Sequence, residues 1–155
     1  MSVLRRLIPK QVDNSFDGLR PALWLLGLVI AMKLPMSLNS ILNTADVAGN
    51  ADGIPLASFG PEAARQLLQL FALMALGHLF LTLVALAALI RWRALVPFGY
   101  LILLGEFLVR QVIVWSYAAP GAESTTVALI VNIGLAILLT LGLILSLIPG
   151  RAREG

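Results

Sequence analysis

The chain of 155 residues contains no cysteine, a single histidine and few charged side chains. The absence of cysteine excludes disulfides, thiolate metal ligands and cysteine nucleophiles, and leaves the redox compartment undetermined. Lys, Arg, Asp and Glu make up 12% of the residues, whereas soluble domains contain about 25%. With 59% hydrophobic residues and a mean hydropathy of +0.94, the composition is typical of an integral membrane protein.

The length limits the protein to one domain, because four spans of about 20 residues and their connections use nearly all of the chain. The hydrophobic runs predict an all-α polytopic membrane protein, a bundle of four transmembrane helices with no separate soluble domain. The predicted parts are an N-terminal arm at 1–20, spans at about 21–43, 65–90, 94–115 and 126–148, and a tail at 149–155.

Proline and glycine mark the limits of the first span and the loop after it. Pro21 is well placed at a first helical position, and Pro35 is expected to kink the helix because it lacks a backbone N–H. The glycines and prolines between residues 44 and 61 predict irregular structure. Part of this loop resembles a calcium loop, but Ala48 and Phe59 would occupy its first and twelfth positions and neither can ligate.

The N-terminal arm carries Arg5, Arg6, Lys10 and Arg20. Two interpretations stay open: a short helix lying on an anionic leaflet, or a partly ordered tail that only fixes topology. We expect the arm to be retained, because a leader of mixed charge precedes the first apolar run and no small-residue cleavage site follows it directly.

The distribution of basic residues predicts the orientation. Eight of the eleven Lys and Arg residues lie in the N-terminal arm, the second connection and the tail. The positive-inside rule therefore predicts that both termini are cytoplasmic. The net charge of +3 reflects this topology, and no nucleic-acid partner is expected because the basic residues are split among three short segments.

Polar side chains occur where the first span should be crossing the membrane. At 100° per residue, Lys33, Ser37, Ser40 and Thr44 share one helical face, which cannot face lipid. Lys33, His78 and Glu106 each lie about 18 Å from the predicted cytoplasmic edge of their spans, near the middle of a ~30 Å core.

Arg110 and Asn132 form a second layer about 6 Å further out. A charged group at the centre of a span costs roughly 2.5 to 3.5 kcal/mol, so Lys33, Glu106 and Arg110 should face the bundle interior and pair with one another. Glu106 and Arg110 are also spaced i to i+4. If Glu106 meets both cations, the excess positive charge leaves room for a carboxylate, an anion or a neutral lysine.

We refer to the predicted ligand-binding or ion-pair residues as the polar cluster, which comprises Lys33, Ser37, Ser40, His78, Glu106, Arg110 and Asn132. Small residues at helical spacing predict close packing beside it. One stripe is Ala75, His78, Thr82 and Ala85, and a second is Ala128, Asn132, Ala136 and Thr140. These patterns predict a bundle whose outer half has a polar interior.

The polar cluster contains no arrangement typical of catalysis, and we predict no catalytic residue, no cofactor and no metal. His78 is either a packed, hydrogen-bonded residue or a proton relay. A bis-His haem needs a second histidine, which only a homodimer could supply. One histidine and one buried glutamate are too few for a zinc site. A Schiff-base role for Lys33 lacks any sign of a pocket for an aldehyde.

Several short blocks resemble a group of small bacterial four-span inner-membrane proteins. They are Lys33-x-x-Met36-x-Leu-Asn39-Ser-Ile41, Ala51-Asp-Gly-Ile-Pro55, Arg91-x-Arg93 with Pro97-Phe98, and Glu106 followed by Arg110. The resemblance covers roughly residues 12–115. It implies the four-span fold and transfers no activity, cofactor or partner.

Two hypotheses of function follow. The first is a non-enzymatic binding, accessory or structural membrane subunit, in contact with the lipid bilayer and with a membrane protein partner or a second copy of itself. The second is a small proton-coupled or anion-conducting transporter that acts through Lys33, His78, Glu106 and Arg110. Four helices enclose little cavity, so this transporter would work as a dimer. An intramembrane enzyme is disfavoured, because no nucleophile with an adjacent base is apparent.

Overall fold

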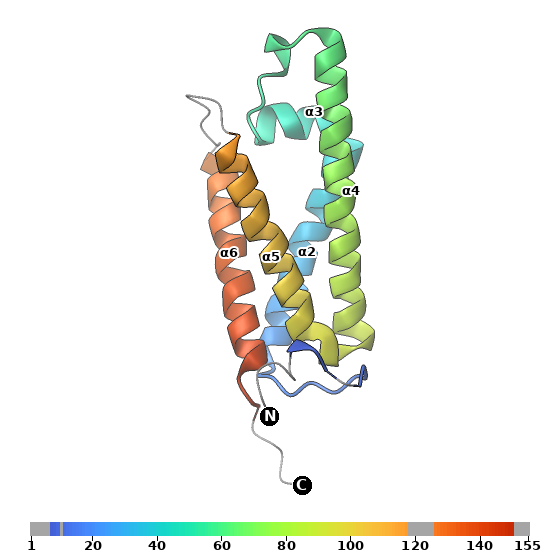
Figure 1. The fold of residues 1–155 in the computed structure, drawn as a ribbon, viewed down its shortest axis with the longest axis vertical. Helices are drawn as coiled ribbons and strands as arrows, with labels where there is room; N and C mark the ends of the chain where they lie inside the picture. The colour runs from blue at the N-terminus through green and yellow to red at the C-terminus, as the bar shows by residue number, and fades with distance from the viewer. Residues whose placement is uncertain (1–6, 10, 118–125, 151–155) are drawn as a thin grey trace.

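The computed structural model describes residues 7–9, 11–117 and 126–150, and these contain helices and turns but no β-strand. Four long helices dominate the fold (Figure 1): α2 (Pro21–Leu42), α4 (Pro61–Arg91), α5 (Val96–Ser116) and α6 (Thr126–Leu147). Each is long and apolar enough to cross a membrane, α5 together with the 3-10 turn η3 (Arg93–Leu95) before it. The prediction of an all-helical protein with four candidate spans is confirmed at this level.

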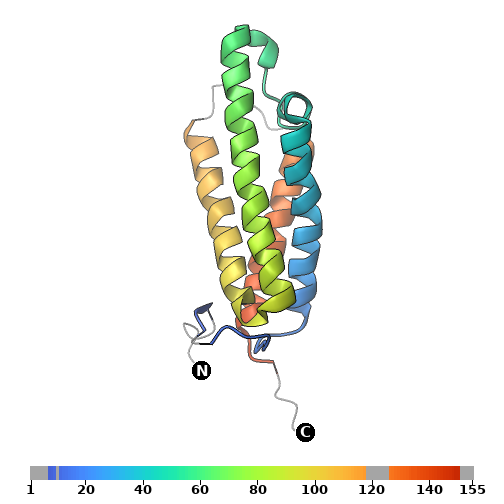
Figure 2. The same cartoon turned by 90° about the vertical axis from the view of Figure 1, so that its right-hand side faces the viewer.

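The four helices form an up-down-up-down ring (Figures 1 and 2). α2 packs mainly against α4 and α6, and α5 packs against α6 and α4, so α2 and α5 lie on a diagonal. We call one end of the bundle the terminal end, where residues 11–20, η3 and the last turn of α6 lie. The opposite end, with the first turns of α4, is the loop end.

α2 runs without interruption through Pro35, the residue at which the sequence predicts a kink. Lys33 and Ser37 are buried on the inner face of α2, whereas Pro35 is exposed. The proline therefore lies on the outside of the bundle, and the polar face of the helix points inward.

The segment after α2 is more regular than its glycines and prolines predict. It continues as α3 (Thr44–Asp46) and a π-helical turn, η1 (Val47–Ala51), before the short 3-10 helix η2 (Leu56–Ser58). The prediction of irregular structure is wrong over 44–51, because two amide side chains bridge successive turns. Asn43 donates to Asn39 and Asn50 donates to Asp46, both at 2.7 Å. The helical path ends near Gly53, whose φ of 72° suits glycine.

α4 is the longest helix, with 31 residues and a length of about 46 Å. It begins at Pro61, four residues before the predicted span, because a proline at the first position and Glu62 in the first turn both favour a helix start. The first turns of α4 project beyond the other three helices at the loop end (Figure 1).

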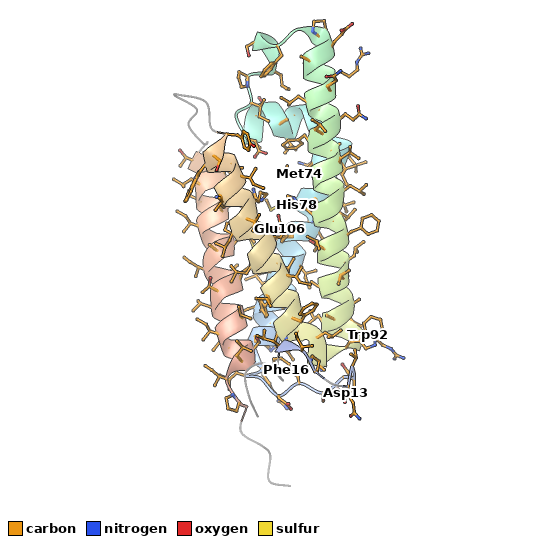
Figure 3. The ribbon with its side chains drawn as sticks, in the orientation of Figure 1. Asp13, Phe16, Met74, His78, Trp92 and Glu106 are labelled. Carbon is orange, nitrogen blue, oxygen red and sulfur yellow. The ribbon has the colours of Figure 1, made fainter. Side chains whose placement is uncertain are left out.

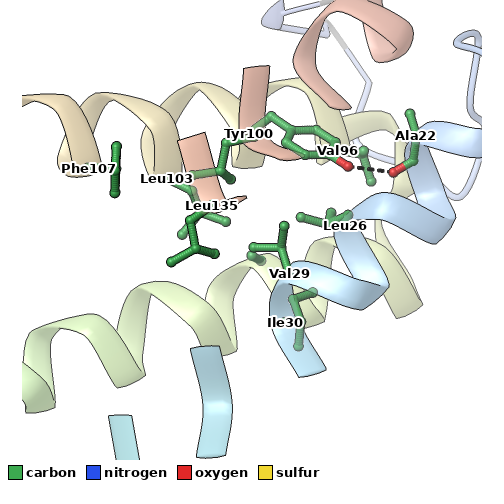
Figure 4. Close-up of a cluster of buried hydrophobic side chains, with 11 residues drawn as sticks. Ala22, Leu26, Val29, Ile30, Val96, Tyr100, Leu103, Phe107 and Leu135 are labelled. Atoms are coloured by element: carbon green, nitrogen blue, oxygen red, sulfur yellow. Dashed lines mark hydrogen bonds between the residues drawn. The ribbon is translucent and has the colours of Figure 1, made fainter. Parts of the chain in front are cut away.

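The hydrophobic core fills the half of the bundle nearer the terminal end (Figure 4). Tyr100 is its largest fully buried side chain, and its hydroxyl donates a 2.6 Å hydrogen bond to the carbonyl of Ala22. A Cβ on Gly142 of α6 would overlap the Tyr100 ring, so the close approach of α5 and α6 requires glycine here. The other core residues are Leu26, Val29, Ile30, Ala85, Val96, Leu103, Phe107, Leu135 and Leu139.

The two predicted small-residue stripes face the interior to different extents. On α4, Ala75, Thr82 and Ala85 are buried, as predicted. On α6, Ala128 and Asn132 line the interior cavity and Ala136 packs against the core, as predicted. Thr140 is exposed, however, and the fully buried positions are Leu135, Leu139, Gly142 and Ser146. The α6 face is rotated because packing against Tyr100 requires Gly142 to point inward.

Residues 11–20 of the N-terminal arm pack against the terminal end of the bundle (Figure 3, Asp13 and Phe16). The Leu19 amide donates to the carbonyl of Leu145 at 3.1 Å, and the Gly150 amide donates to that of Asp17 at 2.8 Å. Gly18 is buried where a Cβ would meet the backbone of Ser146. This part of the arm is therefore joined directly to the end of α6.

Candidate functional site: a charged cluster beside a cavity

Glu106 of α5 is the centre of the polar cluster and contacts three basic groups. Figure 3 labels Glu106 and one of these groups, His78 of α4. Its Oε2 lies 3.6 Å from Lys33 Nζ of α2, and its Oε1 lies 2.9 Å from His78 Nε2 of α4. Oε1 also lies 3.5 Å from Nε of Arg110, one turn along α5. The predicted pairing of Lys33 with Glu106 is confirmed, and it joins the two helices on the diagonal of the ring.

Only the contact with His78 has the length of a good hydrogen bond. A carboxylate can only accept, so Nε2 of His78 is assigned the hydrogen. Within the part of the chain that the structure describes, Glu106 Oε2 and Arg110 Nε are buried without a hydrogen-bond partner. The ion pairs to Lys33 and Arg110 are thus loose, at 3.6 and 3.5 Å.

Lys33 is the most deeply buried of the charged side chains, with 8% of its side-chain surface exposed. Its neighbours on the same face, Ser37 and Ser40, are buried and half-buried. The helical spacing of Lys33, Ser37 and Ser40 places all three on the inner side of α2, as the sequence predicts.

Arg110 connects the cluster to α6. Its Nη2 donates to Asn132 Oδ1 at 3.5 Å, and its guanidinium lies 5.4 Å from the ring centroid of Phe107. The predicted second layer, Arg110 with Asn132, is therefore formed, and the polar cluster receives a side chain from each of the four long helices.

A cavity of about 260 Å³ lies next to these groups, in the half of the bundle nearer the loop end. Glu106 is not among the residues that line it. The carboxylate therefore lies behind its basic partners, which face the cavity. The polar cluster residues in the wall are Lys33, Ser37, Ser40, His78, Arg110 and Asn132.

Two polar residues of the wall were missed by sequence reasoning, Asn39 and Asp52. Asn39 belongs to the polar stretch of the first span, so the sequence pattern did indicate its position. No sequence pattern indicates that Asp52 lies at the cavity, because this residue reaches the cavity only through the π-helical turn that precedes it. Partial desolvation of its carboxyl at the rim of the cavity raises the pKa of Asp52 above its ordinary value, and the nearby Arg110 guanidinium opposes part of the rise.

The arrangement is suited to holding a charged or polar group. Among the described side chains, no three His, Asp or Glu residues lie close enough together to hold a metal ion. The wall instead offers N–H donors from Lys33, Arg110 and Asn132, and hydroxyls from Ser37 and Ser40.

Comparisons of the chain with protein families, with curated proteins and with solved structures find no match. The resemblance to small bacterial four-span proteins therefore stays a prediction.

Proposed function

We propose that this protein is a non-enzymatic binding protein of a bacterial inner membrane, and that it holds a small ligand between its four spans. The observation that carries the proposal is the cavity of about 260 Å³, which is bordered by polar cluster residues from all four long helices, among them Lys33, His78, Arg110 and Asn132.

The loose geometry of the ion pairs supports binding over a purely structural role. Buried charged residues whose only role is to fix the helix register stabilise the fold most when their ion pairs are short and exclude water. Here two of the three contacts to Glu106 are 3.5 Å or longer, and both basic partners face a cavity. The cost of placing these charges inside a membrane protein is offset better by a ligand than by the cluster alone.

The proposed orientation has both termini in the cytoplasm, supported by the basic residues of the arm, the second connection and the tail. The terminal end would then be cytoplasmic and the loop end would face outward. The cavity would lie in the outer half of the membrane, reached past the exposed Asn39 and Asp52.

Filling the cavity should abolish binding. We expect Ser40→Phe to remove the thermal stabilisation that ligands give to the purified protein, because its ring would occupy the polar half of the cavity. Ser116→Phe is the matched control, since it makes the same change on an exposed helical serine outside the cavity wall. A ligand screen in which both variants respond like the wild type would overturn the proposal.

A proton-coupled or anion-conducting transporter is the second candidate, favoured by the 2.9 Å hydrogen bond between His78 and Glu106 beside the cavity. A histidine that is hydrogen-bonded to a carboxylate can relay a proton once a bound ligand has left the cavity. Vesicles with the reconstituted protein would then show pH-dependent flux that Glu106→Gln abolishes. Binding without flux would favour the first function.

A further inference from the structure

We propose that the cavity binds an organic anion, with a carboxylate or phosphate head between Lys33 and Arg110 and a short apolar chain against α4 and α6. This inference rests on the proposed binding function and names its ligand class. The two sources of such a group are a free organic acid and an anionic lipid.

The charge of the cavity wall favours an anion. Lys33 and Arg110 both line the cavity, whereas Glu106, the carboxylate that they share, does not. A bound cation would meet two positive groups before reaching the Glu106 carboxylate. A bound anion would meet both as its nearest neighbours.

The donors of both basic side chains are incompletely used. The 3.6 Å separation of Lys33 Nζ from Glu106 is too long for a hydrogen bond, and an ammonium group carries three N–H donors. Arg110 contacts Glu106 and Asn132 at 3.5 Å, so neither contact is a short hydrogen bond. An oxyanion with two or three oxygen atoms supplies the acceptors that these groups lack.

The rest of the wall accommodates an apolar chain. Phe71 and Met74 come from α4, and Val127, Val131 and Leu135 come from α6. A volume of about 260 Å³ equals that of roughly nine water molecules in the liquid. It therefore suits an acid of about six to nine non-hydrogen atoms, or the head and first methylenes of a longer chain.

Asp52 is the acidic residue of the wall, and it is exposed at the rim. Its carboxylate competes with a bound anion for Arg110. Replacing Asp52 by Asn should therefore strengthen anion binding, which is the opposite of the effect expected for removing a structural contact.

The experiment compares three probes of equal chain length: hexanoate, hexylammonium and hexanol. Each is titrated into the purified full-length protein in neutral detergent, and the midpoint of thermal unfolding is followed by circular dichroism. We expect hexanoate to raise the midpoint more than the other two. This comparison needs no variant, so it stands even if a substitution prevents folding. Hexanol or hexylammonium acting as strongly as hexanoate would overturn the anion class and leave the binding function intact.

Variants then locate the site. Lys33→Met and Arg110→Met should each weaken hexanoate binding at least about tenfold, the loss expected for one charge-assisted hydrogen bond. Arg65→Met is the matched control, because it removes an exposed positive charge outside the cavity wall. Asp52→Asn should strengthen binding, with Glu62→Gln as its control, because it removes an exposed negative charge outside the cavity wall. Equal affinity in the wild type and in Lys33→Met would overturn the proposed site.

A parallel titration with dihexanoyl phosphatidic acid distinguishes the two sources. Stronger stabilisation by the lipid, with the same dependence on Lys33, would support the proposal and identify a lipid. Stabilisation by hexanoate alone would identify a free acid. If neither anion stabilises the wild type, the anion class is overturned, and the Ser40→Phe comparison still decides the binding function.

Discussion

Glu106 links three helices through one carboxylate. It contacts Lys33 from α2 and His78 from α4, and Arg110 on its own helix. Removal of this carboxylate would leave two positive side chains facing each other inside the bundle, whereas removal of Lys33 would leave Glu106 with two partners. The consequences of the two losses should therefore differ.

We expect Glu106→Met to lower the free energy of unfolding by about 3 to 5 kcal/mol, the usual cost of leaving a buried charge without its partner. Lys33→Met should cost less, because His78 and Arg110 still neutralise Glu106 and one buried positive charge is removed. Unfolding of the purified protein by denaturant in neutral detergent measures both changes. Equal losses in the two variants would contradict the central role of the carboxylate.

The charged residues of the site could be predicted from the sequence because their burial in a membrane is so costly. Lys33, Glu106 and Arg110 had no favourable place except near one another. Asp52 could not be predicted in this way, since an aspartate in a loop is well solvated and has no energetic reason to pair. Its position depends on how the turns at 44–51 fold over the cavity, and that is a tertiary effect.

α5 packs closely against α6 where the Tyr100 ring meets Gly142. The tyrosine ring is fully buried, its hydroxyl is fixed by the Ala22 carbonyl, and it touches the α6 backbone at Gly142. The ring cannot move aside without breaking its hydrogen bond to α2. Three helices are thus held together at one position.

Gly142→Ala should therefore destabilise the protein by roughly 1 to 3 kcal/mol, the usual cost of overpacking a tight core. Gly134→Ala on the same helix is the matched control, because a Cβ there meets no other atom within 4 Å. Its effect should be small or stabilising, since alanine favours the helix. Thermal unfolding of the two variants measures the difference. Similar unfolding midpoints would contradict the tight packing of Gly142 against Tyr100.

Helix positions were largely predictable because long apolar runs bounded by Pro21, Pro61 and Pro149 leave few choices. The buried face of α6 could not be predicted, because nearly all residues of this helix are apolar and their pattern does not distinguish one face from another. Its orientation depends on the fit of Gly142 against Tyr100. The helical turns at 44–51 were also missed, because the side-chain bridges from Asn43 and Asn50 offset the local preference for irregular structure.

The whole molecule has two unlike halves. The half at the terminal end is a packed hydrophobic core, and the half at the loop end contains the cavity and the charged groups. If the terminal end is cytoplasmic, the cavity lies toward the outer face of the membrane. Orientation therefore decides which ligands the protein can meet.

The absence of native cysteine allows a direct measurement of orientation, since each introduced cysteine is unique. Ser58→Cys at the loop end and Asn14→Cys in the arm are both at exposed positions. We expect a membrane-impermeant maleimide to label Cys at position 58 in intact spheroplasts, and position 14 only after the membrane is permeabilised. The reverse pattern would contradict the positive-inside assignment.

The diagonal pairing of Lys33 with Glu106 also has a consequence for biosynthesis. A ribosome completes α2 and all of α4 before it makes Glu106, so Lys33 enters the membrane before its carboxylate exists. α2 and α5 are also the two least hydropathic of the four candidate spans. We therefore expect α2 to be retained at the insertion machinery, or at the membrane surface, until α5 emerges. The order of synthesis and the order of stable insertion would then differ.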